Sequence, residues 1–287
     1  MGQQAQRTAR RRRLGAELRA LREAAKVSPE EAAGAIHGDR SKISRQETGR
    51  HRVTRLELDV LLSLYKVKDE KVRERLIALA SEGRKPSWWR QHGQALRPSF
   101  KEGLELKSDA TKICAFQSQV VPGLLQTRAY ASMVMTGSDP LPQEELEFYL
   151  DLRMEGQEIF QREEPPSYLN IVPEGVLRQQ IGGPAVMAEQ LRRLICLSQL
   201  PEVTIQVIPL SQSVFACTGG SFAIYSYPEP VGLDVVQVEY LGGALYLERD
   251  EAVAKYGRAW GRLQATALPA QQSIELIASI ARELEPA

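Results

Sequence analysis

The apolar positions of the first 81 residues recur at steps of three and four, which is the spacing of amphipathic helices. The pattern predicts short helices over residues 12–25, 29–36, 39–48, 54–64 and 68–81. The clearest start signal is Ser28-Pro29-Glu30-Glu31, because it combines a hydroxyl N-cap, a proline at the first helical position and a glutamate that can complete a capping box. We therefore expect an all-α N-terminal unit.

The third of these helices, residues 39–48, has almost no apolar side chain except Ile43. Asp39 is suited to the N-cap, and Gly49 stands where a left-handed residue would end the helix. Ile43 and Glu47 lie about one turn apart, so we expect that stripe to pack inward. The opposite face carries only polar side chains, namely Arg40, Ser41, Ser44 and Arg45. Such a helix can add little to a core, so most of its surface must face something other than this protein.

Past residue 99 the pattern changes to a mixture of strands and helices. Alternating or short apolar runs predict strands over 168–172, 203–210, 221–227, 235–240 and 244–248. Helical spacing predicts helices over 124–135, 185–200, 250–266 and 270–284. Gly242-Gly243 predicts a hairpin between the last two strands. This order predicts a mixed α/β or α+β domain over residues 99–287, so the fold class is multidomain.

Residues 82–98 separate the two units and contain the glycine and proline of a linker. Trp88 and Trp89 lie in this segment, and two adjacent indoles need burial. They are expected to pack against the C-terminal domain or to lie at a subunit contact. The domain prediction is thus a basic N-terminal arm (1–13), a helical domain (14–81), a linker (82–98) and a C-terminal domain (99–287).

The formal net charge of +1 hides an asymmetry between the units. Residues 1–55 hold 14 Arg and Lys against 6 Asp and Glu, a balance of +8, whereas the remaining 232 residues balance at −7. Clustered positive charge binds phosphates with release of counterions, so the first unit is suited to a nucleic-acid partner. Residues 7–13 carry five arginines and permit two interpretations: an arm that contacts DNA in the minor groove or along phosphates, or a solvated extension of the first helix.

Residue chemistry argues against an enzyme. The three histidines are His37, His51 and His92, of which two lie in the basic unit and one in the linker. The sequence has no glycine-rich phosphate loop, zinc-type Cys/His spacing or nucleophile elbow. We therefore expect no catalytic residues, no metal and no cofactor. No apolar run is long enough to span a membrane and no secretory signal is evident, so we expect a cytoplasmic protein without membrane contacts, nucleoid-associated when bound to DNA.

The segment from Ser28 to Arg50 resembles the helix-turn-helix of the XRE, or phage-repressor-like, regulators. In that family the third helix enters the major groove of double-stranded DNA, and an arginine of the first helix pairs with a glutamate of the third. The polar face is suited to this role because arginine and serine can bind base edges. The resulting candidate base contacts are Arg40, Ser41, Ser44 and Arg45. The candidate phosphate contacts are Ser28, Lys42, Arg50 and Arg52. The expected structural pair is Arg22 with Glu47.

The C-terminal unit resembles the antitoxin-like domain, formerly of unknown function, that follows an XRE helix-turn-helix in actinobacterial regulators. Its most specific phrase is Val120-Val121-Pro122-Gly123-Leu124-Leu125-Gln126-Thr127. The resemblance implies a homodimeric transcriptional regulator, often encoded beside a small partner protein, whose C-terminal domain carries dimerisation and partner or signal binding. The alternative is an antitoxin-like or metabolite-sensing module for which DNA binding is only the readout. Glu174 and Arg178 could line a pocket, but a surface ion pair explains their spacing more simply.

Overall fold

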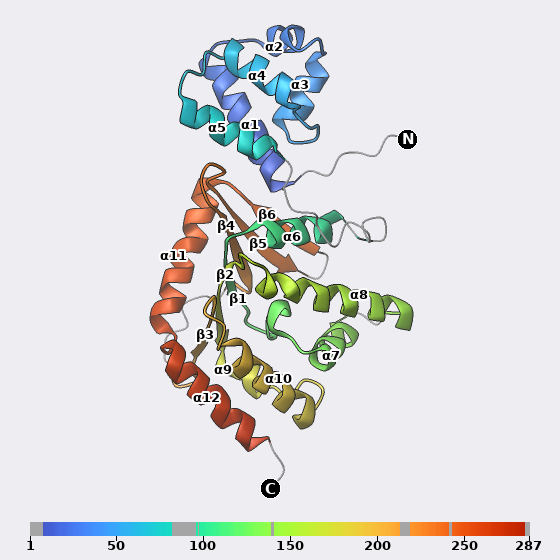
Figure 1. Cartoon of the computed structure of the whole chain (residues 1–287), viewed down its shortest axis with the longest axis vertical. Helices are drawn as coiled ribbons and strands as arrows, with labels where there is room; N and C mark the ends of the chain where they lie inside the picture. Colours follow the sequence, from blue (N-terminus) through green and yellow to red (C-terminus); the bar gives the residue numbers. More distant parts are fainter. Residues whose placement is uncertain are drawn as a thin grey trace.

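The computed structural model describes residues 8–81, 96, 98–138, 141–212, 219–240 and 243–284. Within these ranges the chain forms a helical N-terminal domain and a larger C-terminal domain built on one sheet (Figure 1). The linker indoles, His92 and Gly242 of the expected hairpin lie outside the described residues.

The N-terminal domain consists of five helices that match the expected segments: α1 (Ala9–Ala24), α2 (Pro29–Ala35), α3 (Arg40–Glu47), α4 (Arg55–Leu64) and α5 (Glu70–Ala80). Local sequence explains their starts, because each is preceded by a side chain that accepts a hydrogen bond from a backbone N–H of the first turn: Thr8, Ser28, Asp39, Thr54 and Asp69. Fully buried leucines and Ile43 join the helices in one core.

Helix α1 begins earlier than the sequence pattern predicted. Thr8 caps it through its hydroxyl, and Ala9 is completely buried. The arginines at positions 10–13 therefore belong to the first helix and are not part of a separate arm. Their roles follow from what this first turn packs against, which is described below.

The C-terminal domain contains a six-stranded mixed sheet, with the order β3-β2-β1-β4-β5-β6. The strands are β1 (Lys112–Phe116), β2 (Ser167–Pro173), β3 (Val203–Ile208), β4 (Phe222–Tyr227), β5 (Leu233–Tyr240) and β6 (Gly243–Leu247). Strands β1, β2 and β3 run parallel, whereas β4, β5 and β6 pair antiparallel. The predicted mixed sheet is confirmed, although β1 was not expected.

Helices cover both faces of this sheet (Figure 1). They are α6 (Pro98–Asp109), α7 (Arg128–Ser138), α8 (Gln143–Gly156), α9 (Glu174–Arg178), α10 (Pro184–Leu197), α11 (Asp250–Thr266) and α12 (Ala270–Glu283). Helix α11 packs Trp260 and Leu263 on one face against Phe222 and Val236. Helices α6, α7, α8 and α10 lie on the other face. The sequence pattern predicted α10, α11 and α12 but missed α6 and α8.

The helix expected over residues 124–135 is interrupted. A short 3-10 turn, η2 (Gly123–Leu125), comes first, and α7 begins only at Arg128. Three glutamine side chains bind backbone groups of the segment 121–127 and hold it in this shape: Gln126 itself, Gln157 and Gln190. The phrase that carries the family resemblance is therefore a tightly bonded turn at the carboxyl end of β1.

The close approach of α1 to α3 gives a stability prediction. A Cβ at Gly15 would lie 2.5 Å from the carbonyl oxygens of Gln46 and Glu47, so Gly15→Ala must force the two helices apart. We expect a loss of about 1–3 kcal/mol in the free energy of unfolding, measured by urea titration with circular dichroism.

Gly34→Ala in α2 is the matched control. Nothing lies within 4 Å of a Cβ there. Alanine should therefore raise stability by about 0.5–1 kcal/mol, because glycine is the poorer helix former. A similar change in both variants would contradict the steric explanation.

Candidate nucleic-acid interface

Helix α3 is held to the domain by one side only. Ile43 is 1% exposed and packs in the core that α3 shares with α1 and α2. Gln46 is 2% exposed and faces the loop that follows α3. Gln46 Nε2 donates to Glu57 Oε2 at 3.0 Å. Ile43 and Gln46 thus anchor this side of the helix, and the face that carries Arg40, Ser41, Ser44 and Arg45 is open.

All four candidate base contacts lie on this open surface: Arg40, Ser41, Ser44 and Arg45 are exposed. Arg40 Nη1 is 3.0 Å from Glu30 Oε1, but this side chain is 75% exposed, and such surface pairs contribute little. Among the described residues, the side chain of Arg45 makes no hydrogen bond or ion pair. The face therefore presents two guanidinium groups and two hydroxyls to solvent.

Glu47 turns away from this surface. Its two carboxylate oxygens accept from Arg22 Nε at 2.6 Å and Arg22 Nη2 at 3.1 Å. Both side chains are about nine-tenths buried, and Arg22 Nη1 also donates to the Val27 carbonyl. The bidentate geometry ties the end of α3 to α1 and keeps the one acidic side chain within Arg40–Glu47 away from the face that would meet phosphates.

The four candidate phosphate contacts divide into two groups. Arg50 and Arg52 are exposed in the loop after α3. Lys42, in contrast, is only partly exposed and forms an ion pair with Glu57, and the Ser28 hydroxyl is bonded to Glu31. Burial acts to raise the pKa of Glu57, but hydrogen bonds from Lys42 and Thr54 outweigh it, so its pKa lies below the usual value.

The loop after α3 has a defined shape. Gly49 has a positive φ of 72°, and a Cβ there would lie 2.8 Å from Arg12 N, so only glycine fits. The backbone N–H groups of Arg50 and His51 both donate to the Arg45 carbonyl, at 2.7 and 3.1 Å. His51 is exposed beside the two loop arginines. The sequence reasoning did not include it, although its place between Arg50 and Arg52 was a signal.

The arginines at the start of α1 point to the C-terminal domain. Arg12 lies between two carboxylates, with Nη2 3.0 Å from Glu102 Oε1 of α6 and Nε 2.8 Å from Glu248 Oε1 after β6. Arg13 Nη1 is 2.7 Å from Asp250 Oδ1 at the start of α11. These basic side chains join the two domains, an interpretation that neither sequence hypothesis contained.

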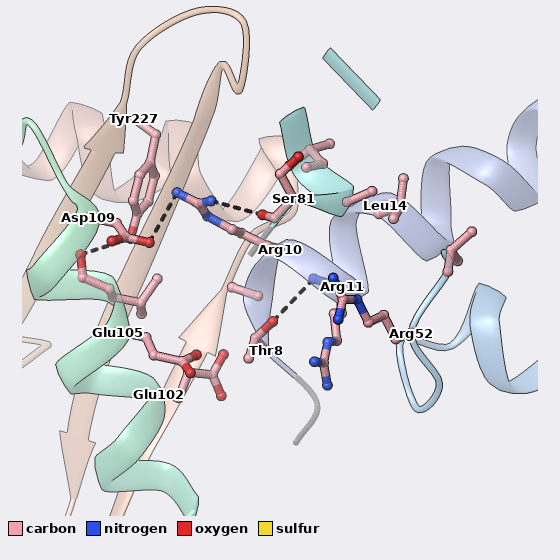
Figure 2. Close-up of a pocket in the computed structure, with 15 residues that line it drawn as sticks. Thr8, Arg10, Arg11, Leu14, Arg52, Ser81, Glu102, Glu105, Asp109 and Tyr227 are labelled. Carbon is pink, nitrogen blue, oxygen red and sulfur yellow. Dashed lines mark hydrogen bonds and ion pairs between the residues drawn. The ribbon is translucent and has the colours of Figure 1, made fainter. Parts of the chain in front are cut away.

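Arg10 completes this interface (Figure 2). Its guanidinium is 3.4 Å from Asp109 Oδ2 and stacks 5.0 Å from the ring centre of Tyr227. It also donates to the Ser81 carbonyl just after α5. A small cleft of about 150 Å³ lies between the domains here, with carboxylates on one wall and arginines on the other. Burial raises the pKa of the Tyr227 hydroxyl well above its usual value, so it stays neutral.

Charge is retained at the centre of this interface. Burial acts to lower the pKa of Arg12, but the hydrogen bond and charge of Glu248, with those of Glu102, raise it overall. Burial raises the pKa of Glu102, and the charge of Arg12 opposes that rise. A single cation therefore balances two partly buried carboxylates.

Among the described residues, no group of three or more His, Cys, Asp or Glu side chains is arranged to hold a metal ion. In the same part of the chain, no helix has the length and apolar character that a membrane crossing requires. Glu174 and Arg178 form the expected pair, at 2.6 Å, but Glu174 is buried and also accepts from Leu210 N. Glu174 therefore stabilises the chain just after β3, and its contact with Arg178 is not a simple surface ion pair.

The interface gives a second prediction. Arg12→Met leaves Glu102 and Glu248 facing each other without their cation, and we expect it to destabilise the docked arrangement by about 3 kcal/mol. Differential scanning calorimetry should show a lower midpoint for the unfolding transition. Arg19→Met, which removes the same charge from an exposed i, i+4 pair on the same helix, should change nothing measurable. Identical traces for the two variants would contradict the assigned role of Arg12.

The ion pair between Arg22 and Glu47, which ties α3 to α1, gives a third prediction. Glu47→Gln removes the carboxylate from a largely buried arginine, so we expect a loss of about 2 kcal/mol in the free energy of unfolding by urea titration. Glu74→Gln, at an exposed position of α5 away from Arg22, is the control and should leave the unfolding curve in place. If Glu47→Gln unfolds at the wild-type urea concentration, the pair is not what holds α3.

Comparison with known families agrees with this arrangement. A helix-turn-helix domain matches residues 13–76, and a domain of unknown function (DUF5753) matches residues 100–279. No curated protein and no solved structure matches the chain significantly. The helix-turn-helix match covers α2 and α3 and indicates a DNA-binding regulator. Because the second match covers more than half of the sequence, the chain belongs to the DUF5753 family and carries a helix-turn-helix domain in front of it.

Proposed function

We propose that this protein is a sequence-specific DNA-binding transcriptional regulator of the XRE type. The observation that carries the proposal is α3, an eight-residue helix anchored by Ile43 and Gln46, whose exposed face bears Arg40, Ser41, Ser44 and Arg45. A helix of this size fits the major groove, and its outward side chains are the types that bind base edges. Such a regulator works on chromosomal DNA in the cytoplasm.

The proposed DNA contacts differ in how far their side chains are already engaged within the protein. Arg45 is the main base reader because it is exposed and has no competing partner in the described chain. Arg50 binds phosphates from the shaped loop after α3, and Arg52, which also has a contact within the protein, is the second phosphate contact of this loop. Ser28 and Lys42 remain in the proposed phosphate set, but each must first exchange a partner within the protein, Glu31 or Glu57.

We further propose that the protein acts as a homodimer on a pseudo-palindromic operator. Half-sites one helical turn apart, roughly 34 Å, require the two DNA-binding domains to be held at a set distance. The ion pairs of Arg10, Arg12 and Arg13 support this, because they fasten each helix-turn-helix to its own C-terminal domain. Dimerisation through the C-terminal domains would then set the spacing.

The C-terminal domain is proposed to bind a signal or a small protein encoded nearby. A metabolite-sensing or antitoxin-like module with DNA binding as readout is the second candidate, and a cavity between α6, α7, α8 and the sheet favours sensing. Native purification followed by mass spectrometry distinguishes binding of a small protein from binding of a metabolite. A stoichiometric small protein supports sequestration, whereas a bound metabolite supports sensing.

The fourth prediction tests base reading. The operator is first selected from a pool of random duplexes, and affinity is then measured on the operator and on a random duplex at several salt concentrations. We expect Arg45→Ala to weaken operator binding by about 1–3 kcal/mol and to leave random binding nearly unchanged. Arg50→Ala should weaken both and lower the salt slope by about 1.

Arg55→Ala is the matched control, because Arg55 is an exposed arginine of the same domain that pairs with Asp59 one turn away. It should bind both duplexes like the wild type. Equal losses on the two duplexes for Arg45→Ala would refute its role as a base reader, and failure to select any operator would refute sequence-specific binding.

A further inference from the structure

A cavity with a charged centre and largely apolar walls lies in the C-terminal domain, on the face of the sheet opposite α11. Its lining residues come from helices α6, α7 and α8 and from β1, β4 and β5. Figure 1 shows these helices on the side of the sheet away from α11. Two overlapping hollows of about 330 and 380 Å³ share its central residues. This size is suited to a small organic molecule. None of the groups that line it takes part in the proposed DNA contacts.

Two cations line the shared part of the cavity, Lys107 of α6 and Arg153 of α8. Arg153 Nη1 donates to Gln126 Oε1 at 2.7 Å, and neither cation forms an ion pair with a described residue. The Lys107 ammonium makes no hydrogen bond within the same described part of the chain. Burial lowers the pKa of both groups, and the charge of Glu239 opposes this. An anion between them would relieve the same cost.

The opposite wall holds one carboxylate in a fixed position. Tyr225 donates to Gln237 Oε1 at 2.7 Å, and Gln237 Nε2 donates to Glu239 Oε1 at 2.7 Å. Glu239 lies beyond ion-pair distance of Lys107 and Arg153. In the hollow of about 330 Å³, and among the residues that the two hollows share, two cations therefore stand against one carboxylate. A second carboxylate, Glu145, lines only the other hollow. The shared part of the cavity thus carries a net positive charge that favours an anionic ligand.

The turn at residues 121–127 builds this site. Gly123 lies so close to Arg153 that a Cβ there would be 2.8 Å from Nη1, and Gln126 binds the same nitrogen. Gln126 is itself fixed by its bond to the Val121 carbonyl. The guanidinium is thus positioned from two sides, as a preorganised binding group requires. The segment 120–127, which carries the family resemblance, therefore helps to position a cation of the cavity.

The rest of the lining is apolar and aromatic. Phe100 and Tyr149 meet edge to face at 5.8 Å at one side of the cavity, and Phe100 is 38% exposed. Leu104, Val134 and Tyr246 add further apolar surface. The cavity thus combines a positive centre with walls for an apolar body.

We propose that this cavity binds a small organic anion, with its carboxylate or phosphate group at Lys107 and Arg153 and its apolar part against Phe100, Leu104 and Val134. The proposal deepens the signal-binding role of the C-terminal domain and rests on it, but not on DNA recognition. It is therefore tested on the full chain without DNA.

Anilinonaphthalene sulfonate, a fluorescent organic anion, is the probe. We expect saturable binding to one site on the wild type. Lys107→Met and Arg153→Met should each weaken it at least about tenfold, the loss of one charge-assisted hydrogen bond. Lys255→Met, which removes one positive charge from α11 on the opposite face, should bind like the wild type. Circular dichroism and thermal midpoints establish that each variant is folded.

Glu239→Gln keeps the proposal testable if a cavity variant fails to fold, because Glu239 is exposed and its loss should strengthen probe binding. Displacement by phenylacetate and by phenyl phosphate distinguishes a carboxylate from a phosphate ligand, with neutral phenylacetamide as the matched control. Stronger displacement by either anion supports the proposal. Equal displacement by the amide, no saturable probe binding, or equal affinity in all variants would overturn it, while DNA binding could still stand.

Discussion

Arg12 lies between Glu102 and Glu248, and this contact holds the helix-turn-helix domain against the C-terminal domain. Two carboxylates from the C-terminal domain converge on one guanidinium of α1, and all three side chains are largely buried. Removing such a cation leaves charges without partners, which costs far more than the loss of an exposed pair. Arg10 and Arg13 extend the contact to α6 and α11. The orientation of α3 therefore follows from the position of the sheet.

Helix α6 connects this interface with the cavity. Glu102 and Asp109 face α1, whereas Gly103 and Lys107 face the cavity on another side of the same helix. Tyr246 of β6 also takes part in both, because its ring lines the cavity and its carbonyl accepts from Arg12. The two regions therefore share α6 and β6.

Local sequence signals were sufficient to predict most of the helices in the N-terminal domain. The capping box of Ser28 and Glu31, the N-cap Asp39 and the positive φ of Gly49 depend on residues within one turn, so the sequence could predict them. Strand β1 could not be predicted in the same way. Its last four residues are all buried between two neighbouring strands and show no alternation, so only its pairing with β2 and β4 identifies it.

The candidate DNA-binding surface shows the same division. By itself, the sequence determined that α3 is short and polar, that Ile43 and Glu47 belong to its inner side, and that positive charge is concentrated before residue 55. Only the tertiary structure decided which cations face outward. Arg45 and Arg50 are exposed, whereas Lys42 pairs with Glu57 and the arginines at 10, 12 and 13 bind the C-terminal domain. The physical reason is that a charge is encoded in its residue, but its partner is set by distant segments that folding brings within a few ångströms.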